Sequence, residues 1–85
     1  MMNVEFYQHR HNTALNVPHL GIKVGEPFWV AMFKDTQTIG YDFENGHGAS
    51  KEIAKQNLLD NLEERLVRTR LLEKIQFVKE LKVEA

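Results

Sequence analysis

The chain contains no cysteine, only two prolines, and no apolar run near the ~20 residues that span a bilayer. Without cysteine there is no disulfide framework, no thiolate ligand for zinc and no thiol nucleophile. A cysteine-free chain fits the reducing cytosol, and the N-terminus lacks the apolar core of a secretory signal. We therefore expect a cytoplasmic protein that does not associate with membranes.

The chain also lacks an excess of either charge. Eleven basic and twelve acidic side chains give a formal net charge of −1. A domain that depends on many phosphate contacts is normally strongly basic. Residues 1–49 carry three basic groups and residues 50–85 carry eight. Any nucleic-acid binding should therefore be weak and confined to a patch in the C-terminal half.

Catalytic chemistry has little support in the sequence. Eighty-five residues form one modest core and leave no room for a substrate domain. Ser50 is the only serine, and a role as a helix cap explains it without a nucleophile's role. His9 and His11 offer half a metal site that His19 or His47 would have to complete. We expect no enzyme activity, no metal, no cofactor and no small-molecule substrate.

Three segments read as strands. Residues 28–33 form a short apolar run, and residues 38–44 alternate strictly between apolar and polar side chains. Residues 34–37 are the expected hairpin turn between them. Residues 20–24 also alternate, and a turn at 25–27 ends them. These patterns predict three antiparallel strands.

A long helix should follow, because no glycine or proline appears after Ser50. Gly46 and Gly48 are expected in the preceding turn with positive φ, and Ser50 is expected to cap the helix. The apolar row that would pack on the sheet is Ala54, Leu58, Leu62 and Leu66, flanked by Leu59. The row loses register at 67–70. Residues 71–83 fit a second helix better than a strand, whereas residues 1–16 fit either a short helix or an edge strand.

The predicted fold is therefore α+β. A three-stranded antiparallel sheet is packed by the helix that starts near Ser50, with an additional C-terminal helix. The chain is expected to form a single domain over 1–85. It divides into an N-terminal segment (1–17), a sheet-and-helix core (18–66) and a C-terminal extension (67–85).

The helix start combines features that suit an anion. Lys51 and Lys55 lie four residues apart beside the helix N-terminus, where backbone amides and the helix dipole also favour negative charge. The run from Gly46 to Leu62 resembles the second helix of the double-stranded-RNA-binding domain, whose pattern is G-x-G-x-S-K-K-x-A-K. The resemblance implies duplex-RNA contacts through Gly48, Ser50, Lys51 and Lys55.

Two departures from that family weaken the implied RNA contacts. Glu52 occupies the position of the second lysine. The loop that carries a G-P-x-H motif in the family corresponds to Gly25-Glu26-Pro27 and has no histidine. Duplex recognition by shape needs several contacts along the groove. The resemblance thus implies a binding module with weakened affinity for duplex RNA.

A second resemblance uses some of the same residues. HicB-like antitoxins place an aromatic and valine-rich hairpin before an S/T-x-E-x-A helix. Trp29-Val30-Ala31 together with the run from Ser50 to Ala54 is similar to that pattern. The resemblance implies a protein that covers a small toxin.

The central run has more apolar side chains than one face requires. Residues 28–33 are apolar on both sides, so either residues 71–83 or another chain should cover the second face. We expect a protein partner or a homodimer, with Trp29, Phe33, Arg68 and Arg70 as candidate interface residues. A small phage-type accessory or inhibitor protein that acts through the Trp29 face is a further hypothesis.

Overall fold

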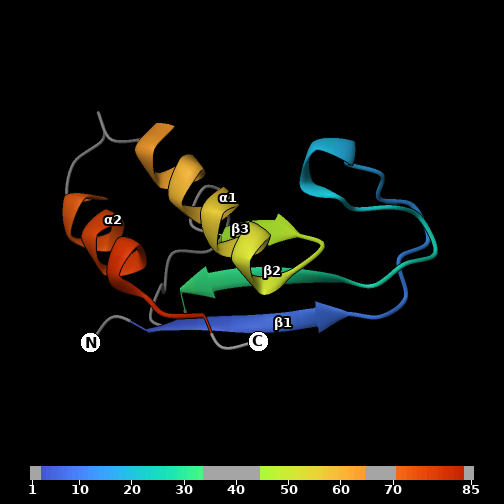
Figure 1. The fold of residues 1–85 in the computed structure, drawn as a ribbon, viewed down its shortest axis with the longest axis horizontal. Coiled ribbons are helices and arrows are strands. Elements are labelled where there is room, and N and C mark those ends of the chain that lie inside the picture. The colour runs from blue at the N-terminus through green and yellow to red at the C-terminus, as the bar shows by residue number, and fades with distance from the viewer. Residues whose placement is uncertain (1–2, 34–44, 65–70, 84–85) are drawn as a thin grey trace.

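The computed structural model describes residues 3–33, 45–64 and 71–83. Along the chain it places strand β1 (Val4–His9), a 3₁₀ turn η1 (Pro18–Leu20), strands β2 (Phe28–Phe33) and β3 (Asn45–Gly48), and helices α1 (Lys51–Glu64) and α2 (Leu71–Glu80). The strands form one sheet, and α1 and α2 lie together over it (Figure 1). This confirms the predicted α+β fold with a C-terminal helix.

The sheet is antiparallel with β2 in the centre. Its order is β1-β2-β3. Val4 pairs with Phe33 at one end of β1 and His9 pairs with Phe28 at the other. On the opposite side of β2, Trp29 pairs with Gly48 and Met32 pairs with Asn45. The prediction that residues 28–33 form a strand is confirmed.

The other two strands differ from those expected. Residues 20–24 do not form a strand, because Pro18 starts a 3₁₀ turn and Gly21 ends it in the left-handed region at φ 72°. A single bridge between Val17 and Ile22 closes this turn. The third strand is β1 instead, so the edge-strand alternative for the N-terminus is the right one. The predicted strand at 38–44 and its hairpin turn lie outside the described residues.

Asn12 holds the segment between β1 and β2 in place. Its side chain is 6% exposed and donates to the carbonyl oxygens of Leu15 and Lys23, both at 2.7 Å. Its Oδ1 atom accepts from the Leu15 amide at 2.8 Å. A buried amide group with its donors and acceptor satisfied by backbone groups fixes the conformation of this loop.

Gly46 and Gly48 belong to β3, not to a turn with positive φ. Neither has positive φ, whereas Gly21 and Gly25 of the described residues do. A Cβ atom on Gly46 would lie 2.7 Å from Leu58 Cα, and one on Gly48 would lie 2.5 Å from the Ala54 nitrogen. The expected turn is therefore wrong, and the glycines are needed because α1 crosses β3 at backbone contact.

Helix α1 buries the predicted apolar row. Ala54, Leu58 and Leu62 are fully buried, and Leu59 is 9% exposed. Leu66 lies outside the described residues. Helix α2 confirms the helical reading of residues 71–80, and residues 81–83 continue without helical structure. Ile75 and Val78 of α2 join the same core as Phe33 and the leucines of α1.

The two faces of β2 are covered differently. Ala31 and Phe33 face the helices and belong to the main core. Phe28 and Val30 form a second cluster on the opposite face with Ile22, against which Val17 and Leu20 pack. The alternative in which residues 71–83 cover the second face is therefore wrong, because α2 packs in the main core. The loop around η1 covers one end of it, and Tyr7 and Met32 stay 45% and 38% exposed.

Candidate interaction site

Ser50 caps α1 as its sequence position predicts. Its Oγ atom accepts from the Ile53 amide at 3.2 Å, and its carbonyl oxygen accepts from the Ala54 amide at 3.0 Å. A serine at this position satisfies one of the amides that the first helical turn leaves unpaired. The predicted cap at the start of α1 is therefore confirmed.

The two lysines beside this cap make contacts within the chain. Lys51 Nζ lies 4.8 Å from the centre of the Trp29 ring, in the range of a cation–π contact. Lys55 Nζ donates to the carbonyl oxygen of Leu81 at 2.6 Å and so ties the C-terminal segment to α1. The lysines thus point to different partners. A phosphate held by both ammonium groups would have to compete with these contacts.

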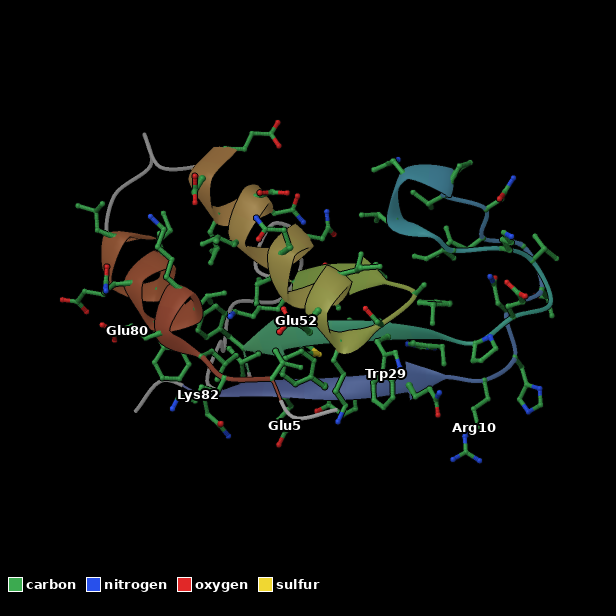
Figure 2. The ribbon with its side chains drawn as sticks, viewed as in Figure 1. Glu5, Arg10, Trp29, Glu52, Glu80 and Lys82 are labelled. Carbon is green, nitrogen blue, oxygen red and sulfur yellow. The ribbon has the colours of Figure 1, made fainter. Side chains whose placement is uncertain are left out.

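A shallow pocket of about 330 Å³ lies beside the start of α1. It is lined by Trp29, Ala49, Ser50, Lys51, Glu52 and Val83. Trp29 and Glu52 are labelled in Figure 2. The charged residues of the lining have opposite sign, so the pocket does not present a purely positive surface to an anion.

Of the predicted protein-interface residues, the structure describes Trp29 and Phe33. Trp29 is half-buried and packs at the border of the main core. Phe33 is 3% exposed, and its ring centre lies 6.1 Å from that of Phe77. Phe33 is therefore a core residue in this structure. Arg68 and Arg70 lie outside the described residues.

Phe33 also has a cation beside it. Lys74 Nζ lies 5.2 Å from the centre of the Phe33 ring. Partial burial of this lysine lowers its pKa below the usual 10.5. The end of β2 that carries Phe33 is thus packed by α2 on the helix side.

The outer edge of β3 is closed by two asparagines of α1. The His47 amide donates to Asn57 Oδ1 at 2.9 Å, and Asn61 Nδ2 donates to the Asn45 carbonyl at 2.8 Å. The asparagines lie four residues apart on one side of the helix, so both reach the same strand. They occupy backbone groups that would otherwise pair with another strand.

These two hydrogen bonds show to which side the backbone groups of each β3 residue point, and the same alternation then gives the direction for β2 and β1. Asn45 and His47 turn their backbone groups outward, so Gly46 and Gly48 bond to Ala31 and Trp29 of β2. The direction alternates along each strand. Residues 28, 30 and 32 of β2 therefore face β1, where the register pairs them with His9, Tyr7 and Glu5.

The remaining positions of β1 direct their backbone groups away from the sheet. These are Val4, Phe6 and Gln8. No residue in the described part of the chain forms a hydrogen bond with their N–H or C=O groups. Figure 1 shows β1 as the outermost described strand. Glu5 and Arg10, labelled in Figure 2, lie near the two ends of this edge.

The sequence contains a signal for each edge, and the one for β1 underlies the edge-strand alternative for residues 1–16. Val4 and Phe6 alternate with Glu5, which is the period-two pattern of a strand. Asn57 and Asn61 are poor helix formers at a spacing of four residues inside a helix. Such a pair lowers helix stability unless the side chains bond to a neighbouring element, and here both bond to β3.

His9 and His47 flank the Phe28 ring and form an aromatic row with it. The His9 ring stacks on Phe28 with 4.9 Å between centres, and the Phe28 and His47 ring centres are 6.0 Å apart. Within residues 3–33, 45–64 and 71–83, no three His, Asp or Glu side chains are grouped to hold a metal ion. Over the same ranges, no helix has the length and apolar character needed to cross a bilayer.

No family model, no curated protein and no solved structure matches this chain. The fold and the geometry of the two sheet edges are therefore the observations on which its function can be argued.

Proposed function

We propose that this protein is a non-catalytic protein-association module, and that its partner adds a β-strand to the outer edge of β1. The observation that carries the proposal is the unequal state of the two edges. The backbone groups of Val4, Phe6 and Gln8 lack hydrogen-bond partners in the described part of the chain, whereas Asn57 and Asn61 close the edge of β3.

The shape of β1 supports strand addition. It is six residues long, and its pairing with β2 is continuous from Val4 to His9, so no bulge twists the edge away. It contains no proline and no lysine, which are the usual means of protecting an edge. An extended segment that pairs here gains main-chain hydrogen bonds, while its side chains lie beside those of β1.

The order of the elements favours a protein partner over RNA. The double-stranded-RNA-binding family requires a helix before its first strand, and the corresponding segment here is β1. Lys55, one of the two matched lysines, is bonded to Leu81. The HicB-like resemblance requires only a sheet followed by a capped helix. Under that resemblance the partner is a small toxin protein.

The test is to purify the tagged native protein and two variants of Gln8 from extracts of the source organism, and to compare the proteins that bind to each. Gln8 is exposed, and Gln8→Pro removes an outward N–H while leaving the bonds to β2 intact. Gln8→Ala removes the same side chain but keeps the N–H. We expect a partner to bind the native protein and Gln8→Ala and to be lost from Gln8→Pro.

The far-ultraviolet circular dichroism spectrum establishes that each variant is folded. Equal retention of every bound protein by both variants would place the interaction elsewhere and overturn the proposal.

Duplex RNA is a second candidate because Ser50 caps a helix whose first turn carries Lys51. If RNA binds there, its affinity should fall steeply with salt, and the double variant Lys51→Glu, Lys55→Glu should abolish it. The matched control is Lys79→Glu, Lys82→Glu, which makes the same charge change at exposed positions in α2 and after it. Binding that is absent, salt-independent or equally reduced in both variants excludes this site.

A further inference from the structure

We infer that the strand added to β1 is the β1 strand of a second copy, so that the protein forms a twofold symmetric dimer with one continuous sheet. The inference rests on the proposed function, since it names the partner at the same edge. It follows from the positions of the outward backbone groups, from the side chains around them and from the closed edge of β3.

The three outward positions are self-complementary in one antiparallel register. A twofold axis at Phe6 pairs Phe6 with the same residue of the second copy and pairs Val4 with Gln8 in both directions. All of these are then hydrogen-bonded pairs, each exchanging two bonds. Shifting the register moves at least one of the three positions beyond the strand end, because β1 ends at Val4 and His9.

The side chains on the helix face suit this register. Phe6 is half-buried in one chain and packs against the main core from its border. At the axis the two Phe6 side chains become direct neighbours, and aromatic cross-strand pairs stabilise a sheet. Val4 would lie opposite the aliphatic part of Gln8. Pairing thus completes the burial of the aromatic residue at the centre of the edge.

The opposite face is complementary in polarity. The same register places Glu5 opposite Tyr7 of the second copy, in pairs whose side chains are closest. The Tyr7 hydroxyl already donates to the Glu5 carboxylate within one chain. Across the axis it meets an equivalent carboxylate, so neither a like-charge pair nor a buried unpaired charge arises on this face.

The assembly ends at two copies because, among the described strands, each chain offers one edge that α1 does not cap. Asn57 and Asn61 occupy two outward groups of β3, the His47 N–H and the Asn45 carbonyl, so a dimer joined through β1 has a helix-capped β3 at either end. A symmetric interface of this kind does not propagate. An unrelated partner would need its own exposed strand, whereas the second copy supplies a matching one by symmetry.

The first measurement is the mass in solution by light scattering at increasing protein concentration. We expect twice the mass of one chain for the native protein and for Gln8→Ala, and the mass of one chain for Gln8→Pro at the same concentration. A dimer of the native protein that persists in Gln8→Pro would use another surface, and it would overturn the inference.

The second measurement reads the register and does not depend on proline. The native sequence has no cysteine, so Glu5→Cys and Tyr7→Cys each introduce a single thiol. Under mild oxidation a mixture of the two variants should form a covalent dimer, because these positions face each other at about 4.5 Å between Cα atoms. Each variant alone should crosslink at least several-fold less. Efficient crosslinking of Tyr7→Cys alone would mean that the twofold axis lies at Tyr7, which contradicts the register centred on Phe6.

The outcomes separate this inference from the proposed function. A native protein that stays monomeric, while Gln8→Pro still loses a partner from the extract, rejects the second copy and keeps the β1 edge as a binding site. A monomer whose extract partners are indifferent to Gln8→Pro rejects both. A dimer that is lost in Gln8→Pro and crosslinks in the mixture supports both.

Discussion

The two outer strands of the sheet differ in how their backbone groups are satisfied. In β3, the outward His47 N–H and the outward Asn45 carbonyl bond to side chains of α1. In β1, the outward groups of Val4, Phe6 and Gln8 have no such partner among the described residues. The comparison shows that whether an edge is available is decided by the neighbouring helix, not by the strand's own residues alone.

The closed edge depends on how near α1 lies to β3. Gly46 and Gly48 carry no side chains, so the backbone of α1 rests directly on the strand and Asn57 and Asn61 reach its border. No equivalent contact exists beside β1 in the described structure. There the C-terminal segment lies over the helix face, where Leu81 packs against the main core and accepts from Lys55.

The largest expected effect comes from adding a methyl group between α1 and β3. In Gly46→Ala the new Cβ would lie 2.7 Å from Leu58 Cα, and neither backbone can move without disturbing the core. We expect a loss of about 3 kcal/mol in the free energy of unfolding, measured in urea.

Gly25→Ala is the matched control for this change. Gly25 has φ 87° with open space around it, so strain alone should cost about 1 kcal/mol. Equal losses in the two variants would mean that the close helix–strand contact is not what Gly46 provides.

Removing the two asparagines should open the closed edge. The double variant Asn57→Ala, Asn61→Ala loses two hydrogen bonds to β3, at about 1 kcal/mol each, and regains about half of this through the higher helix propensity of alanine. Stability should therefore fall by about 1 kcal/mol. The larger change is in assembly, because both edges of each chain become available.

We expect assemblies larger than a dimer in sedimentation velocity for this double variant. Gln56→Ala is the control, since Gln56 bonds only to Asp60 on the exposed side of α1 in the described structure. If the double variant keeps the native mass, the asparagines do not protect the edge.

The sequence predicted the parts of the fold that depend on local patterns. The cap at Ser50, the buried row from Ala54 to Leu62 and the central strand at 28–33 follow from residue type and periodicity, and all are confirmed. The apolar alternation at Leu20, Ile22 and Val24 was misleading. There Pro18 and Gly21 set backbone angles that a strand does not have, and Val24 is 54% exposed.

The candidate site was harder to predict, because it depends on contacts between distant residues. The double glycine suggested a turn, yet its cause is a helix whose Leu58 crosses Gly46 from twelve residues further along the chain. The lysine pair suggested a shared anion site, but Lys55 meets a carbonyl 26 residues away. Which edge stays open is likewise set by Asn57 and Asn61, and no local pattern in β1 contains that information.

A smaller effect is expected at the start of α1. Ser50→Ala removes the acceptor for the Ile53 amide, and the usual cost of losing such a cap is about 1 kcal/mol. Ser50→Asp keeps an acceptor and should retain most of the stability in urea denaturation. Because the cap lies away from Asn57 and Asn61, both variants should keep the native mass in solution. A change in assembly for Ser50→Ala would mean that the helix start, and not its middle, governs the edge.

The smallest effect is expected where the C-terminal segment meets α1. Lys55→Met keeps the aliphatic stem but removes the ammonium group that donates to the Leu81 carbonyl, at a cost of about 0.5 kcal/mol. The segment at 81–83 should then exchange its amide hydrogens faster, while the amides of α1 change little.

Lys79→Met is the control, because Lys79 is exposed on α2 and has no contact to this carbonyl among the described residues. Since Leu81 packs against the main core on the helix face of the sheet, a loosened segment leaves the backbone edge of β1 unchanged. The dimer should therefore persist in Lys55→Met, and its loss would show that the C-terminal segment, not the strand edge alone, holds the two copies together.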